Sequence, residues 1–67
     1  MYASQCLTES EFMSQPWTWI THKWWCDITW RGGSTYRWFF KSPDARAWLV
    51  RVFAPFADMT ASGERGE

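Results

Sequence analysis

The chain has 67 residues, including 7 Trp and 5 Phe, and its 7 basic and 7 acidic residues give a formal net charge of zero. This length predicts one small domain, in which aromatic side chains must supply much of the buried apolar area. The sequence shows no secretory signal, transit peptide or membrane-spanning run, and Cys6 and Cys26 fit no disulfide framework or zinc spacing. We therefore expect a cytoplasmic protein without a metal or other cofactor.

The charges are unevenly distributed along the chain. Six basic residues and two aspartates give residues 16–57 a net charge of +4, whereas residues 1–15 and residues 58–67 each carry −2. A basic folded part suits an acidic partner, either a nucleic acid or an acidic protein.

Residues 1–15 are polar and weakly patterned, with one local signal. Thr8 and Glu11 are spaced as a capping box, in which each side chain accepts a hydrogen bond from the backbone N–H of the other residue. This spacing predicts a short helix through Phe12 and Met13 that ends before Pro16.

The next segment, residues 17–21, reads Trp-Thr-Trp-Ile-Thr, an alternation that suggests an additional strand. A tight turn at His22 and Lys23 would pair this strand with the following one and match their apolar faces. The alternative is one long, bulged strand over residues 17–31. We favour the hairpin, with His22 as a loop residue.

Residues 24–41 predict a β-hairpin around a glycine turn. The even positions on both sides of the turn are apolar, so even residues must oppose even residues across the hairpin. A three-residue loop of Gly32, Gly33 and Ser34 satisfies this condition. It pairs Trp30 with Tyr36, Ile28 with Trp38, and Cys26 with Phe40. Cys26 is then expected on the core face as a buried free thiol.

An amphipathic helix follows the hairpin. Ser42 is its expected N-cap and Pro43 its first residue, and Pro55 should end it near Ala54. Asp44 places a negative charge at the positive end of the helix dipole, while Arg46 and Arg51 lie off the apolar stripe and should be solvated. The stripe expected to be buried consists of Ala45, Trp48, Leu49, Val52, Phe53 and Phe56.

These elements predict an α+β fold, a small antiparallel sheet of two or three strands packed on one C-terminal amphipathic helix in the order β-β-β-α. The domain should span residues 16–57. A polar segment with a short helix precedes it (residues 1–15), and a disordered tail of small and charged residues follows it (residues 58–67).

The odd-numbered face of the hairpin is basic and carries two large aromatic side chains, so we expect the binding site there. The candidate binding residues are Trp25, Arg31, Arg37, Phe39 and Lys41. We expect Trp25 and Phe39 to be exposed and to mark an interface, with the cations beside them on phosphates, guanine edges or a protein partner. Solvated cations partly neutralised by Asp27 are the simpler alternative.

The order of strands, glycine turn and helix resembles the arm-type N-terminal DNA-binding domain of tyrosine integrases and the plant ethylene-response-factor DNA-binding domain. The resemblance covers about half of the chain. It implies a three-stranded sheet on one helix, with the outer sheet face entering the DNA major groove. The residues that carry it are 24–31, Gly32, Gly33 and 35–41, with Phe40, Lys41 and Ser42 leading into Ala45, Ala47, Trp48 and Leu49.

We therefore expect a small non-enzymatic binding module from a phage or other mobile element, with DNA slightly favoured as its partner. The alternative is a small phage-type inhibitor, similar to anti-CRISPR proteins, that blocks a protein or nucleoprotein through the same aromatic and basic face. An enzyme is the weakest hypothesis because the single histidine, His22, has no nearby partner pattern. No membrane partner is expected, and a homodimer is compatible with the many aromatic side chains.

Overall fold

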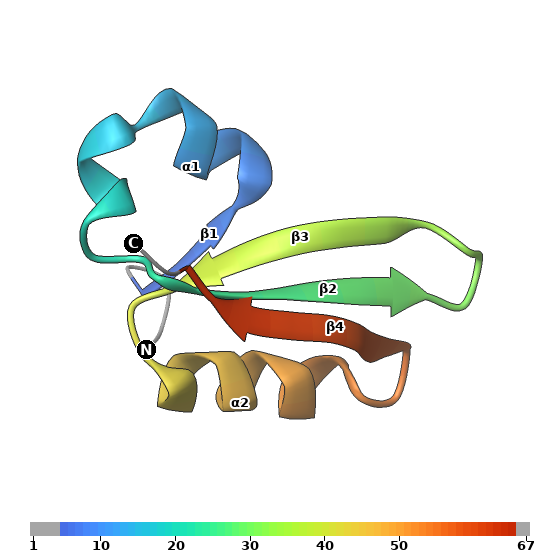
Figure 1. Cartoon of the computed structure of the whole chain (residues 1–67). Coiled ribbons are helices and arrows are strands. Elements are labelled where there is room, and N and C mark those ends of the chain that lie inside the picture. The colour runs from blue at the N-terminus through green and yellow to red at the C-terminus, as the bar shows by residue number, and fades with distance from the viewer. Residues whose placement is uncertain (1–4, 66–67) are drawn as a thin grey trace.

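The computed structural model describes residues 5–65, which form a four-stranded antiparallel sheet with helices on both faces (Figure 1). The elements are β1 (Cys6–Thr8), α1 (Glu9–Ser14), the 3-10 helix η2 (Pro16–Trp19), β2 (Trp24–Trp30), β3 (Thr35–Phe40), α2 (Pro43–Phe53) and β4 (Ala57–Glu64). The strand order is β1-β3-β2-β4. The predicted α+β class is confirmed, with four strands rather than two or three.

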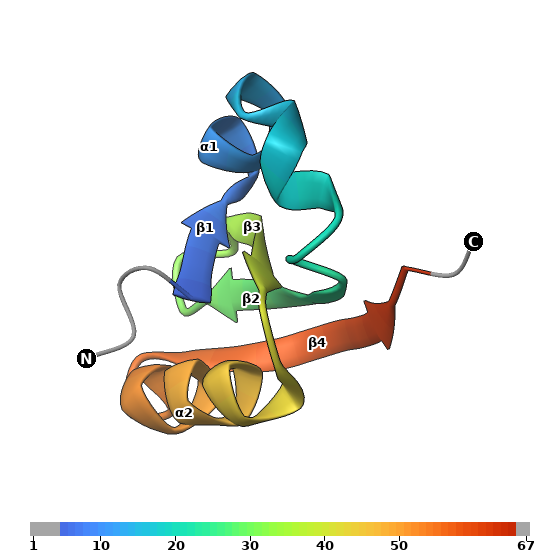
Figure 2. The same ribbon diagram turned by 90° about the vertical axis from the view of Figure 1, so that its left-hand side faces the viewer.

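The helices divide unequally between the two faces. In Figures 1 and 2, α2 runs along the even-numbered face of the sheet, whereas α1 and η2 cover only one end of the odd-numbered face. We call the odd-numbered face the outer face. Its other end, toward the hairpin loop, is left open.

The hairpin keeps the predicted faces but not the predicted register. The structure pairs Ile28 with Tyr36 and Cys26 with Trp38, a shift of two residues from the expected pairs. The loop has the predicted length of three residues but consists of Arg31, Gly32 and Gly33, because Trp30 N donates to Ser34 O over 2.8 Å. Gly33 also donates to Trp30 O and has a φ of +98°. This is a turn closed by a left-handed glycine, which no side-chain-bearing residue adopts without strain.

The core lies between the even-numbered face and α2. Its buried members are Cys26, Ile28, Phe40, Ala45, Leu49 and Ala57, with Trp24, Trp30, Trp38, Trp48, Val50 and Phe53 packed around them. Cys26 is a free and fully buried cysteine, as predicted. Burial raises the pKa of its thiol to about 11, so the thiol stays protonated at neutral pH.

Helix α2 begins and ends as predicted, with the Ser42 side chain accepting from Ala45 N and Ala54 at the C-cap. Four residues of the predicted stripe, Ala45, Trp48, Leu49 and Phe53, lie in or against the core, whereas Val52 and Phe56 are exposed and Val50 packs against the core instead. Arg46 is likewise not freely solvated. Arg46 Nη1 donates to Trp25 O and to Gly63 O, which ties that side of α2 to β2 and β4.

The N-terminal capping box is confirmed. Thr8 caps α1 and accepts from Glu11 N, while the Glu11 side chain accepts from Thr8 N. Just before it, residues 6–8 form the short strand β1, which lacks a sequence signal of its own and pairs with β3.

Both strand interpretations of residues 17–21 are wrong. Pro16 begins η2, in which Thr18 N and the Thr18 hydroxyl both donate to Gln15 O. The indole Nε1 of Trp19 donates to Phe12 O over 2.8 Å, which ties η2 to α1. Proline is favoured at the first position of a helix, which explains why these residues form a helical turn although their pattern alternates like that of a strand.

The tail predicted to be disordered is ordered through Arg65, because β4 occupies the second edge of β2. Main-chain hydrogen bonds to β2 do not depend on apolar side chains, so the small and charged residues of 57–64 form a strand despite their composition. Residues 66–67 lie outside the described part of the chain. Within the described residues, no helix is long and apolar enough to cross a membrane.

Candidate functional site

The centre of the open outer face is an ion pair between β2 and β3. Arg37 Nε donates to Asp27 Oδ1 over 2.7 Å, and Arg37 Nη2 donates to Asp27 Oδ2 over 3.0 Å. Asp27 and Arg37 are directly opposite, at a position whose main-chain groups turn away from each other, which brings the side chains closest. Neutralisation by Asp27, which the simpler alternative allowed for either Arg31 or Arg37, thus occurs at Arg37.

This bidentate contact changes the acidity of both groups. The hydrogen bonds from Arg37 lower the pKa of the Asp27 carboxyl, and the same bonds raise the pKa of Arg37, with a further attractive contribution from Glu9. Arg37 is therefore paired with one carboxylate and attracted by a second. It is less available to a phosphate than an unpaired arginine would be.

Trp25 lies beside this pair on the outer face and is half-buried. The Arg37 guanidinium stacks 4.2 Å from the centre of the Trp25 ring, in cation–π geometry. From the opposite side of the sheet, Arg46 Nη1 donates to Trp25 O and to Gly63 O, which binds β2 and β4 together. These contacts hold Trp25 and Arg37 in one fixed arrangement.

Phe39 is not an exposed ring, contrary to the prediction. It is 5% exposed and stacks on Phe12 with ring centres 3.8 Å apart and planes 6° apart. Phe12 is buried in turn, with Trp19 on one side and the guanidinium of Arg65 5.2 Å from its ring. The covered end of the outer face is thus a second, smaller apolar cluster that belongs to the fold.

The remaining predicted cations lie far apart. Arg31 is exposed in the hairpin loop, and Lys41 is exposed just after the other end of β3, where its N–H donates to Gln5 O. The structure therefore brings together Trp25 and Arg37, buries Phe39, and leaves Arg31 and Lys41 at opposite ends of the hairpin. It does not assemble one basic patch.

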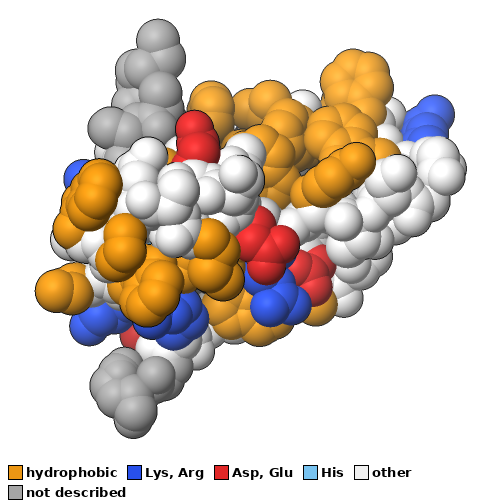
Figure 3. Space-filling model, turned by 90° about the horizontal axis from the view of Figure 1, so that it is seen from above, with side chains coloured by type: hydrophobic (Ala, Val, Ile, Leu, Met, Phe, Trp, Pro, Cys, Tyr) orange, Lys and Arg blue, Asp and Glu red, His pale blue; other side chains and the backbone are white. Residues whose placement is uncertain are grey.

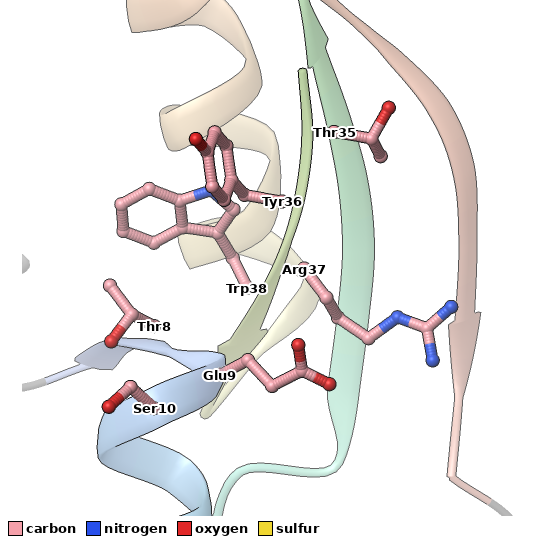
Figure 4. Close-up of a pocket in the computed structure, with 7 residues that line it drawn as sticks. All are labelled: Thr8, Glu9, Ser10, Thr35, Tyr36, Arg37 and Trp38. Atoms are coloured by element: carbon pink, nitrogen blue, oxygen red, sulfur yellow. The ribbon is translucent and has the colours of Figure 1, made fainter.

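A groove beside β3 is the feature that the sequence analysis missed. It has a volume of about 320 Å³ and is lined by Thr8, Glu9, Ser10, Thr35, Tyr36, Arg37 and Trp38. Figure 4 shows Tyr36 and Trp38 on one side, with Thr8 and Ser10 facing them from the start of α1. The Nε1 of Trp38 is buried and has no hydrogen-bond acceptor within residues 5–65. An unmet buried donor costs about 1–3 kcal/mol, which makes this indole a candidate ligand contact.

Hydrophobic side chains form the other unpredicted surface. Trp17 and Ile20 are 69% and 76% exposed, and their spacing of three residues places them on one side of the 3-10 helix. We call this pair the η2 ridge. Figure 3, which looks onto the outer face, shows hydrophobic side chains at the η2 end and a second group nearer the hairpin loop, with charged side chains between.

The described residues offer no site for a metal. No group of three or more His, Cys, Asp and Glu side chains in residues 5–65 could hold an ion. His22 follows η2 as expected of a loop residue, but it is buried, and its Nδ1 lies 2.9 Å from the Thr21 hydroxyl and 3.3 Å from Thr18 O.

Comparison with protein-family models, with curated proteins and with solved structures found no match to this chain. The resemblance to the integrase arm-type and ethylene-response-factor domains therefore stays a prediction.

Proposed function

We propose that the chain is a small non-enzymatic binding module whose partner is another protein, contacted through exposed aromatic and aliphatic side chains. The observation that carries the proposal is the η2 ridge, two large hydrophobic side chains that are more than two-thirds exposed on a 3-10 turn that Trp19 ties to α1. Burying them in a partner would remove apolar area from water, which is the main driving force of association.

The wider surface supports the same conclusion. Large hydrophobic side chains that are at least 40% exposed include Met13, Trp17, Trp19, Ile20, Tyr36, Val52, Phe56 and Met59. Single exposed hydrophobic residues are normal, but this many on so short a chain is typical of an interaction surface. Aromatic residues, Met and Arg are also the types enriched in protein interfaces.

The charges favour a protein over a nucleic acid. Arg37 is paired with Asp27 and attracted by Glu9, while Arg31 and Lys41 lie at opposite ends of the hairpin, so these three cations do not form one cluster. With a net charge of zero, the chain also lacks the field that draws DNA-binding proteins to DNA. A small inhibitor from a phage or other mobile element is the form of this function that best fits the size of the chain.

Binding of DNA through the open outer face is the second candidate. The observation that favours it is the stack of Arg37 on Trp25, which presents a guanidinium and an indole edge on a fixed sheet surface. In this case, Arg31 and Lys41 would contact phosphates on either side.

The test compares two pairs of hydrophobic residues at different places in the fold. The wild-type chain and its Trp17→Ser/Ile20→Ser variant are each expressed in cells, and the proteins that each one captures are identified. Each captured protein is then purified and its binding to the wild-type chain and to the variant is titrated in vitro. The proposal predicts a one-to-one complex that the ridge variant weakens at least tenfold, since two anchors are lost. The Val52→Ser/Phe56→Ser variant, at the end of α2, is the matched control and should bind normally.

A salt titration of binding to random-sequence duplex DNA tests the second candidate. Binding that weakens steeply with salt and is lost in Arg31→Ala or Lys41→Ala, but not in the ridge variant, would replace the protein proposal.

A further inference from the structure

Strand β3 has an edge that β1 covers only in part. Strand β1 pairs with Trp38, Phe39 and Phe40, and the chain then leaves the sheet at Thr8 to enter α1. On this side of β3, no strand of the described residues pairs with positions 35–37. Those positions form the wall of the groove that faces the start of α1.

The hydrogen-bond pattern shows which main-chain groups point into the groove. Trp30 N donates to Ser34 O, so Ser34 and then every second residue of β3 bond to β2. Thr35 and Arg37 alternate with these and therefore direct their N–H and C=O groups away from β2. Lys41, the next odd-numbered residue after β3, likewise directs its N–H to the β1 side, where it donates to Gln5 O. Thr35 N–H, Thr35 C=O and Arg37 N–H thus point to an open strand edge, whereas the pairing of Thr8 with Trp38 directs Glu9 N–H to Arg37 C=O.

The side chains around this edge define what could bind there. Tyr36 is 58% exposed, and the apolar body of Trp38 lies next to it on the same face (Figure 4). The buried Nε1 of Trp38 requires an acceptor. On the α1 side, the groove presents the Glu9 carboxylate, whereas the positive charge of Arg37 is paired with Asp27, which does not line the groove.

We propose that this groove binds an extended segment of the protein partner by β-strand addition, as a fifth strand that continues the line of β1. The proposal rests on the proposed function and names the form of partner that it requires. Main-chain bonds to Thr35 and Arg37 hold the segment, a hydrophobic side chain packs on Tyr36 and Trp38, and a carbonyl or side-chain oxygen accepts from Trp38 Nε1. On the other face of the added strand, a Lys or Arg beside Glu9 is favoured over an acidic residue.

The size of the groove favours a narrow occupant such as a single strand. Its volume of about 320 Å³ is at the low end of the range of about 300–1,000 Å³ for ligand pockets. A second copy of this chain would bring a sheet edge with its own helices to a gap closed by Thr8, Glu9 and Ser10. An extended segment of a few residues fits, whereas a folded domain does not.

The probe is a library of random twelve-residue peptides displayed on phage and selected against the wild-type chain. The edge is blocked with Arg37→Pro, which removes the outward N–H while leaving the bonds of β3 to β2, and Arg37→Ala is the matched control that loses the ion pair but keeps the N–H. Selected peptides should share a hydrophobic residue at one position. They should bind the Pro variant about tenfold more weakly than the Ala variant, as expected for one lost hydrogen bond with its neighbouring contacts.

A second measurement uses the wild-type chain, so it does not depend on how the Pro variant folds. In the free protein, the amide protons of Thr35 and Arg37 should exchange rapidly and that of Tyr36 slowly, since only Tyr36 N–H bonds to β2. A saturating selected peptide should protect Thr35 and Arg37 and shift the Trp38 indole N–H resonance. Methylating the peptide nitrogens that face β3 should abolish binding, whereas methylating the alternate nitrogens should not.

Three results would overturn the proposal. They are the absence of any enriched peptide, peptides that bind without protecting Thr35 and Arg37, and self-association of the chain that Arg37→Pro abolishes, which would make a second copy the occupant. The ridge variant separates this failure from that of the proposed function. If the ridge variant no longer bound a natural partner but Arg37→Pro bound it normally, the protein-binding function would stand and strand addition would be rejected.

Discussion

Gly63 lies directly against the indole of Trp25 on neighbouring strands. A Cβ atom at Gly63 would be 2.9 Å from Cζ2 of Trp25, closer than side chains approach one another in folded proteins. The indole cannot move away freely, because the Arg37 guanidinium stacks on it and main-chain contacts from Arg46 hold both strands. The absence of a side chain at Gly63 therefore allows the Trp25 indole to pack closely against β4 on the outer face.

Replacing Gly63 with alanine should lower the free energy of unfolding by about 1–3 kcal/mol, since the added methyl overpacks the contact with Trp25. Urea denaturation followed by tryptophan fluorescence would measure the loss. Gly32→Ala, where a Cβ would meet no atom within 4 Å, is the matched control and should change stability by less than about 0.5 kcal/mol. Equal stability of the two variants would contradict the packing described for Trp25.

The ion pair of Asp27 should make stability depend on acidity. Hydrogen bonds from Arg37 lower the pKa of Asp27 in the folded state, so the pair stabilises the fold above the unfolded-state pKa near 3.8. This contribution is lost as the pH falls through the lowered folded-state value. Because the Arg37 side chain is 42% exposed, solvent screening limits the contribution to about 0.5–1 kcal/mol.

Urea unfolding at pH 7 and at pH 2.5 would detect this dependence. Asp27→Asn should be less stable than the wild type at pH 7, and the difference should shrink at pH 2.5. Asp58→Asn, on the edge strand β4, serves as the control. A constant difference between wild type and Asp27→Asn at both pH values would show that the charge of Asp27 does not matter.

At the scale of elements, α2 begins and ends as predicted, and its buried side matches the predicted stripe at Ala45, Trp48, Leu49 and Phe53 but not at Val52. Its cap, first residue and end depend on local contacts, whereas its buried side depends on the strands beneath it. Arg46 donates to Gly63 O of β4 and Val50 packs against the core, which leaves Val52 at 44% exposure.

This orientation predicts unequal effects of two similar substitutions in α2. Leu49→Ala should cost about 2–5 kcal/mol, because Leu49 is buried in the core. Val52→Ala, one turn along the helix, should cost less than about 0.5 kcal/mol. Thermal unfolding of both variants would test the prediction. A large loss in Val52→Ala would instead support the stripe expected from the sequence.

At the scale of the whole molecule, the two ends of the chain complete the sheet. Strand β1 lies beside β3 at one edge and β4 lies beside β2 at the other, so the central hairpin is flanked by segments from opposite ends of the sequence (Figure 2). The outer strands also carry the contacts that fix α1 and α2. The domain predicted for residues 16–57 is therefore not the whole folding unit.

A chain that ends at Phe56 should fail to fold. It lacks β4, and with it the main-chain bonds to β2 and the acceptor at Gly63 O that Arg46 uses. Far-ultraviolet circular dichroism and the dispersion of amide proton resonances would show the loss, and a chain that ends at Arg65 is the control. A stable fold in the shorter chain would restore the prediction of a tail that does not contribute.

The sequence by itself determined the elements whose signals span a few residues. The capping box of Thr8 and Glu11, the Ser42 cap followed by Pro43, and the glycine turn all act through contacts within one turn of chain, so composition and spacing suffice to predict them. Alternation also determined which side of the hairpin is apolar. The candidate residues Trp25 and Arg37, paired on the outer face, were predicted from this alternation.

Only the tertiary structure decided the register, the sheet edges and the true exposure of the candidates. A shift of two residues keeps every side chain on its face, so the hydrophobic pattern cannot distinguish the observed register from the predicted one. Phe39 was predicted to be exposed to solvent, but Phe12, which is distant in the sequence, covers it. The groove beside β3 exists because β1 ends at Thr8, and no local pattern shows where one strand stops alongside another.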